Sequence, residues 1–156
     1  MSRFRSDEIT LLLPSFQPYV QAVLDDMTAQ GFKPILFDGL RTPAEALRNA
    51  KRGTGKVQSP HLYGLAADVI CDDHGWSCRE KKCKFYAKLV AAVRSRGLIT
   101  GADFHNAQGK PMVDEPHFQG LPPAQERKVR ELGMSDESIP ERDAIVAAWL
   151  KQHAKL

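Results

Sequence analysis

The chain has 156 residues, of which 42% are hydrophobic and 26% are charged, and its formal net charge is +3. These values are typical of a globular protein and exclude an intrinsically disordered chain, which combines low hydrophobicity with high net charge. The length predicts a single domain over residues 1–156. No run of five basic residues occurs, which argues against a nucleic-acid binder.

No apolar stretch of the sequence approaches the length of a transmembrane helix. The first residues lead only into a short apolar segment at residues 9–13, which is too short for the core of a signal peptide. We therefore expect a protein that is made in the cytosol and has no membrane-spanning segment.

The first half of the chain predicts a helix, a strand and a second helix. Apolar residues at steps of three and four indicate an amphipathic helix over residues 14–30, and a short apolar run at residues 34–37 indicates a strand. Thr42, Pro43 and Glu45 form a helix start, with a hydroxyl cap, a proline in the first turn and a glutamate three residues after the cap. Arg41 is therefore expected at a junction between a strand and a helix.

The second half alternates in the same way after a flexible basic loop at residues 51–56. We expect a central strand over residues 65–71, a helix from Phe85 to Gly97, and two strands at residues 98–105 and 112–118 joined by a turn. Further helices are expected from Pro122 and from near Pro140, the last packing its apolar face on the core. This order predicts an α+β fold, with a small, largely antiparallel sheet flanked by helices.

Three cysteines, Cys71, Cys78 and Cys83, lie within thirteen residues. Their spacing matches neither a pair of CxxC zinc motifs nor the disulfide framework of a small secreted protein. We expect reduced thiols, with Cys71 buried at the end of its strand. Because His74 lies among them, a second metal site and one local disulfide remain the alternatives.

Two segments carry residues that can bind zinc. His61 and Asp68 lie seven residues apart on either side of Gly64, which allows the chain to bend and bring both to one ion. About fifty residues later, His117 follows Asp114 and Glu115. Two imidazoles, one carboxylate and an open position make a catalytic zinc site, in which the metal acidifies a water molecule.

These motifs together resemble the VanY-type zinc D-alanyl-D-alanine carboxypeptidases and the related L-alanyl-D-glutamate endopeptidases of phage endolysins. The matching positions are Ser59-x-His61-x-x-Gly64-x-Ala66-x-Asp68 and Asp114-x-Pro116-His117-Phe118, with residues 37–42 similar to the family segment that supplies an arginine. The resemblance spans residues 38–119. It implies a hedgehog/DD-peptidase-like fold, a zinc cofactor and a peptide of the bacterial cell wall, the peptidoglycan stem peptide, as substrate.

The resemblance also assigns roles to individual residues. It implies His61, Asp68 and His117 as zinc ligands, Asp114 as general base and Arg41 as the cation that stabilises the oxyanion. Ser59 is expected to bind substrate or to support the site, and Phe104, where the family has a tryptophan, to form a pocket wall. Strict strand alternation instead puts Glu115 on the face of His117, so Asp114 can act only if the chain bends at Pro116.

Three functions follow, in order of preference. The first is an L-alanyl-D-glutamate endopeptidase, because a protein without a signal peptide can reach the wall by lysis or through a pore made by another protein. The second is a D-alanyl-D-alanine carboxypeptidase. The third is a zinc-binding recognition module without catalysis, as in the hedgehog signalling domain, although Asp114 and Arg41 argue against it. Trp76 and His105 are expected to have local packing roles rather than functional ones.

Overall fold

The computed structural model describes residues 7–53, 55–56, 58–78 and 82–156. Its centre is an antiparallel four-stranded sheet in the order β1-β2-β4-β3. The strands are β1 (Pro34–Asp38), β2 (Ala66–Cys71), β3 (Ile99–Thr100) and β4 (His117–Gln119). The expected α+β class and antiparallel sheet are therefore confirmed.

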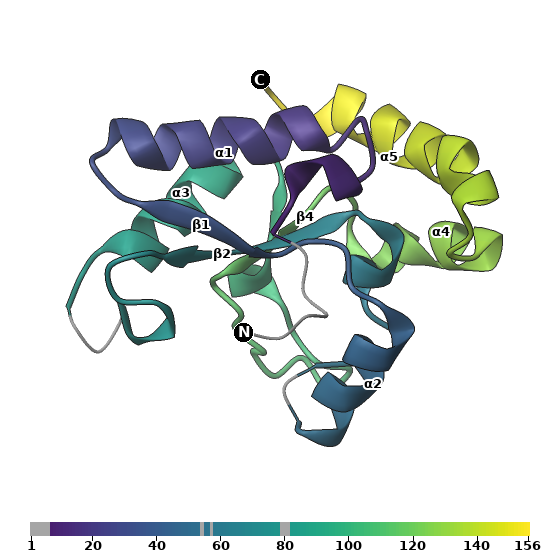
Figure 1. Ribbon diagram of the computed structural model, residues 1–156, viewed down its shortest axis with the longest axis horizontal. Helices are drawn as coiled ribbons and strands as arrows, with labels where there is room; N and C mark the ends of the chain where they lie inside the picture. The colour runs from purple at the N-terminus through teal and green to yellow at the C-terminus, as the bar shows by residue number, and fades with distance from the viewer. Residues whose placement is uncertain (1–6, 54, 57, 79–81) are drawn as a thin grey trace.

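Within the described residues, five α-helices surround this sheet: α1 (Gln17–Ala29), α2 (Pro43–Lys51), α3 (Phe85–Ser95), α4 (Glu126–Leu132) and α5 (Ile139–His153). In Figure 1, α1 and α5 lie above the sheet, α3 and α4 lie to its left and right, and α2 lies below it. No helix in the described part of the chain is long and apolar enough to cross a membrane.

Local sequence explains where α2 begins and which face of α5 is buried. The Thr42 side chain accepts a hydrogen bond from the Glu45 backbone N–H, and the Glu45 carboxylate accepts one from the Thr42 N–H, which completes the expected capping box of α2. At the other end of the chain, Val146, Trp149 and Leu150 of α5 are buried in the core, as their spacing predicts.

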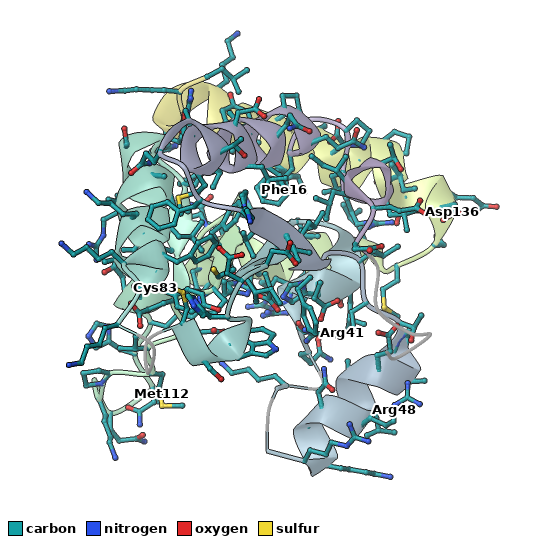
Figure 2. All side chains as sticks on the ribbon, turned by 60° about the vertical axis from the view of Figure 1, so that its left-hand side comes forward. Phe16, Arg41, Arg48, Cys83, Met112 and Asp136 are labelled. Atoms are coloured by element: carbon teal, nitrogen blue, oxygen red, sulfur yellow. A yellow bond between two sulfur atoms is a disulfide. The ribbon has the colours of Figure 1, made fainter. Side chains whose placement is uncertain are left out.

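The two faces of the sheet have different roles. Phe118 of β4 is fully buried and packs edge-on against Phe16, just before α1, with ring centroids 6.1 Å apart. Figure 2 shows Phe16 between α1 and the sheet. Because side chains alternate along a strand, His117 and Gln119 project from the opposite face. The face with Phe118 therefore supports the core, and the other face is available for a site.

The strands expected at residues 98–105 and 112–118 are much shorter in the structure. β3 ends at Thr100, whose side chain accepts a hydrogen bond from Ala102 N and starts the 3₁₀ helix η4 (Gly101–Asp103). β4 begins only at His117, after a turn. Between them, His105 and Pro111 form an isolated bridge. Local side-chain caps and prolines thus replaced strand pairing that the apolar pattern alone predicted.

Candidate metal centre

The sheet places three acidic or imidazole side chains in one row. Asp68 of β2 pairs with Asp38 of β1 on one side and with His117 of β4 on the other. Directly opposed residues of antiparallel strands project from the same face. Two sequence segments that are about fifty residues apart therefore meet at Asp68.

His61 reaches this row from the short 3₁₀ helix η2 (Pro60–Tyr63). Ser59 caps this helix by accepting a hydrogen bond from His61 N, and Gly64 ends it in the left-handed conformation, with φ of 73°. A side chain at Gly64 would both strain this φ and approach Leu13 N to 3.2 Å. The bend that the sequence required between His61 and Asp68 is thus made at Gly64.

The ligand atoms of His61, Asp68 and His117 all lie within 4.8 Å of one another. His61 Nε2 is 3.3 Å from Asp68 Oδ2, and His117 Nδ1 is 3.1 Å from Asp68 Oδ1. The remaining nitrogen of each ring meets a protein oxygen, Gly39 O at 2.7 Å from His61 Nδ1 and Gln119 Oε1 at 2.8 Å from His117 Nε2.

This arrangement fits a zinc ion. Each imidazole can donate its outer N–H to a protein oxygen, which leaves the lone pair of its inner nitrogen directed at the point where the Asp68 carboxylate lies. Two nitrogens and one carboxylate oxygen are a common donor set for catalytic zinc, with further positions free for water and substrate.

The charges at the centre favour an ionised Asp68 carboxylate. Burial opposes ionisation of Asp68, but the adjacent His61 and His117 outweigh it and lower the pKa of Asp68 well below its usual range. Burial lowers the pKa of His117, but its hydrogen bond to Asp68 and the Asp68 charge raise it overall. The carboxylate is therefore ionised at neutral pH, as a metal ligand must be.

Arg41 lies beside the three ligand candidates and is 8% exposed. Its Nε and Nη2 both donate to Asp38 Oδ2, its Nη1 donates to Ser59 Oγ at 3.3 Å, and its Nη2 is 3.6 Å from Asp68 Oδ2. The backbone N–H of Arg41 also donates to His61 O at 3.0 Å. The guanidinium is thus fixed in place, and Figure 2 shows it directed into the interior.

A turn brings Asp114 to the same centre. His117 N donates to Asp114 O at 3.2 Å across Glu115 and Pro116, so strict strand alternation does not apply there. Although Asp114 as a whole residue is exposed, desolvation of its carboxyl group and then the nearby charge of Asp68 raise its pKa, while His117, His61 and Arg41 oppose the rise. The bend required for Asp114 is present, and the argument that favoured Glu115 is removed.

The approach of Asp114 depends on Gly101, which the sequence analysis did not single out. Asp114 N donates to Gly101 O at 2.9 Å. A Cβ atom at Gly101 would lie only 2.2 Å from Asp114 O, a distance that backbone cannot tolerate. Nothing in the local sequence distinguishes Gly101 from a turn glycine, because the neighbouring segment is thirteen residues away.

The two residues expected at the substrate differ in position. Phe104 lies against the centre, with its ring centroid 5.4 Å from that of His117. Ser59 is 4% exposed, and its hydroxyl accepts hydrogen bonds from Arg41 and from the His61 backbone. Ser59 therefore positions a cation and a ligand candidate, while Phe104 is placed to form a wall.

The structure adds a supporting residue that the motifs did not reveal. Gln119 is fully buried, and besides contacting His117 it donates from Nε2 to Glu126 Oε1 at 2.7 Å and to Leu121 O. Arg130 Nη1 in turn lies 3.3 Å from Glu126 Oε2. A polar glutamine two residues after a ligand histidine, on the same strand face, was the available signal.

The cysteine loop departs from expectation. Cys78 and Cys83 form a disulfide with a Cα–Cα distance of 5.4 Å, within the range that a disulfide requires, so the expectation of three reduced thiols is wrong for this pair. Cys71 is free and buried, as expected. In the same loop, Trp76 packs edge-on against Phe37 of β1 at 5.0 Å but remains 52% exposed.

Comparison with known proteins agrees with this geometry. Residues 52–120 match the family model described as D-alanyl-D-alanine carboxypeptidase. The fold is similar to that of the Serratia marcescens L-Ala D-Glu endopeptidase ChiX, with a TM-score of 0.55 and 21% identity over 76% of this chain and 87% of that chain. No curated protein matches the sequence.

A second solved structure is a mutant of the vancomycin resistance D,D-pentapeptidase VanY in complex with Zn(II). Its TM-score is 0.49 and its identity 20%, over 83% of this chain and 82% of that chain. The segment that matches the family model contains His61, Asp68, Asp114 and His117. The family resemblance is therefore confirmed over residues 52–120, the segment that carries the three candidate zinc ligands.

Proposed function

We propose that the chain hydrolyses a peptide bond of the peptidoglycan stem peptide, with His61, Asp68 and His117 holding zinc, Asp114 as general base and Arg41 stabilising the oxyanion. The observation that carries this proposal is the convergence of the three donor atoms within 4.8 Å beside Arg41. A zinc ion bound there would polarise the scissile carbonyl and lower the pKa of a water molecule.

Asp114 supplies the base that hydrolysis requires. Its carboxylate takes a proton from the attacking water and gives it to the nitrogen of the leaving amine, so one water is consumed and the C–N bond breaks. A pKa raised from the ordinary value of aspartate moves this group toward the operating pH, where proton transfer in both directions is most efficient.

Arg41 stabilises the charge that develops on the carbonyl oxygen. Asp38 and Ser59 already hold its guanidinium, so no reorganisation is needed when the negative charge forms. Phe104, beside His117, gives the substrate an apolar wall. Ser59 acts through Arg41 and His61 and does not itself contact the substrate.

The first choice of bond is the one between L-alanine and D-glutamate. The supporting observation is the likeness in fold to the ChiX endopeptidase, whose name specifies this bond. Removal of a terminal D-alanine is the second choice, and the description of the matched family model supports it. Both reactions use the same ligands and base, so the substrate cleft decides between them. We propose the bacterial cell wall as the place of action.

The test is mass spectrometry of defined pentapeptide stems, one with lysine and one with diaminopimelate, after incubation with zinc-loaded protein. A fragment that begins at D-glutamate identifies the endopeptidase, whereas loss of one alanine identifies the carboxypeptidase. A chelator that removes zinc must abolish either product. Intact peptides beside zinc-loaded protein would contradict the proposal and favour a recognition module or another peptide substrate.

A further inference from the structure

A second group of metal-binding side chains lies outside the candidate metal centre. The ligand atoms of Cys71, His74, Cys78 and Cys83 lie within 4.8 Å of one another. Cys71 ends β2, and the other three residues follow it in the chain before the start of α3. Figure 2 shows Cys83 close to the first turn of α3.

The Cys78–Cys83 disulfide accounts for only two of these four residues. It requires neither the Cys71 thiol, which is 3% exposed, nor the His74 imidazole, whose Nδ1 lies 3.7 Å from Cys78 Sγ. In a tetrahedral zinc site, the Zn–S and Zn–N bond lengths give a sulfur to nitrogen distance of about 3.6 Å. The His74 ring is therefore already at ligand distance from a cysteine sulfur.

We propose that, in the reduced chain, Cys71, His74, Cys78 and Cys83 bind a structural zinc ion. Three thiolates and one imidazole are a standard closed donor set for zinc. A thiol reductant converts the disulfide to two thiols, and is itself oxidised, with two electrons and two protons transferred. Zinc then displaces one proton from each of the three thiols.

Backbone hydrogen bonds between described residues bring these side chains together. Gly75 N donates to Cys71 O, and Cys83 N donates to Cys78 O at 3.2 Å. Lys82 has a positive φ of 55°, a conformation that a lysine keeps only when its surroundings impose it. Tyr86 of α3 donates to Gly75 O at 3.0 Å and ties the loop to the core.

The charges near the loop suit a zinc complex of this type. Zinc with three thiolates and a neutral imidazole has a net charge of −1. The exposed Lys82 and Lys84 flank Cys83 and lower the cost of three thiolates in one place.

The consequence for the enzyme is a stabilised contact between this segment and β1. Trp76 lies between two of the proposed ligands, His74 and Cys78, and packs against Phe37. Phe37 directly precedes Asp38, which holds Arg41. Zinc at this position would therefore fix the packing of Trp76 on β1, the strand that supplies Asp38.

The test uses the full chain, kept reduced with a phosphine, with metal content and cobalt(II) spectra as readouts. We expect two zinc ions per chain and, after cobalt substitution, the near-ultraviolet charge-transfer band of cobalt thiolates. Cys71→Ser should lose one zinc and the band but keep peptide hydrolysis. The double variant His61→Ala and His117→Ala should lose the other zinc and keep the band.

Cys71→Ser is informative because Cys71 takes no part in the disulfide. If this variant does not fold, His74→Ala changes an exposed side chain and should weaken zinc retention and alter the band. One zinc per reduced chain without a thiolate band, or a band that is unchanged in both Cys71→Ser and His74→Ala, would overturn the proposal. Metal content and the cobalt(II) spectrum do not depend on peptide hydrolysis. A failure of the proposed peptidase function would therefore leave these two results unchanged.

Discussion

Asp68 and His117 are register partners on neighbouring antiparallel strands, and Asp68 Oδ1 lies 3.1 Å from His117 Nδ1. His61 Nε2 approaches the other oxygen of the same carboxylate at 3.3 Å. The Asp68 carboxylate therefore lies between the two histidines. As a proposed ligand, it would provide the negative charge that offsets part of the charge of zinc.

Replacing Asp68 with asparagine should separate zinc binding from folding. The amide keeps the shape of the side chain but not its charge, so we expect the affinity for zinc to fall more than the ~10–100-fold typical of removing a residue that only orients a ligand. Competition with a chelator of known affinity measures this loss. Unchanged zinc affinity in Asp68→Asn would remove Asp68 from the ligand set.

Gln119→Leu tests whether the orientation of His117 matters. The change removes the oxygen that His117 Nε2 meets and leaves Glu126 without the donation from Gln119, so we expect about 10–100-fold weaker zinc binding or slower hydrolysis. Gln152→Leu, at an exposed position on α5, is the matched control. Equal zinc affinity in the two variants would show that Gln119 has only a packing role.

Asp114→Asn and Glu115→Gln form a pair that identifies the base. We expect Asp114→Asn to retain zinc and to lose about 10²–10⁴-fold in kcat, because proton transfer is removed while the ligands stay. Glu115→Gln should remain within a few-fold of the unmodified enzyme. The measurement is kcat on the stem peptide that is cut, together with zinc content, and the reverse ranking would assign the base to Glu115.

Arg41→Lys keeps the positive charge but cannot reproduce the fixed guanidinium that Asp38 and Ser59 hold. We expect kcat to fall by about 10²–10³-fold with zinc content unchanged. Arg52→Lys, an exposed position after α2, provides the control for the same chemical change. A loss confined to KM would mean that Arg41 binds the ground state of the substrate instead of the oxyanion.

Glu126 should make stability depend on pH. Burial, partly opposed by Gln119 and Arg130, raises its pKa above the ordinary value of 4.5. A carboxyl group with a raised pKa in the folded state contributes stability below its unfolded pKa, and this contribution is lost as pH rises through the folded value. The free energy of unfolding of the unmodified chain should therefore fall relative to Glu126→Gln above pH 4.5.

Denaturant unfolding of chelator-treated protein at several pH values measures this difference. The two chains should follow parallel curves below pH 4, and the gap should reach a plateau once Glu126 is ionised in the folded state. A gap that is independent of pH would show that Glu126 titrates normally.

The sequence alone was sufficient where the signal is local. The capping box at Thr42 and Glu45 involves neighbouring residues, and the bend at Gly64 depends on one residue's freedom to adopt positive φ. The helical spacing in α5 likewise predicted its buried face. The motifs around His61 and His117 indicated the family resemblance, because the order and spacing of the donor residues can be read without knowing how the chain folds between them.

The shortened strands show where such reasoning fails. Apolar residues at 98–105 and 112–118 indicated long strands, but the hydrogen bond that the Thr100 side chain accepts from Ala102 N and the turn before His117 satisfy the backbone in another way. Choosing between these alternatives requires knowing which segments lie opposite each other, and a single-sequence pattern does not contain that information.

The sequence by itself determined the donor types, the order of the motifs, the α+β class and the likeness to zinc peptidases, because all of these depend on residue identity and short spacing. Only the tertiary structure decided that Asp38, Asp68 and His117 share one row, that Gln119 supports His117, and that Gly101 admits Asp114. It also decided that His74 and three cysteines meet at one point. These relationships join residues distant in sequence or set within an irregular loop, and register and close packing create them when the whole chain folds.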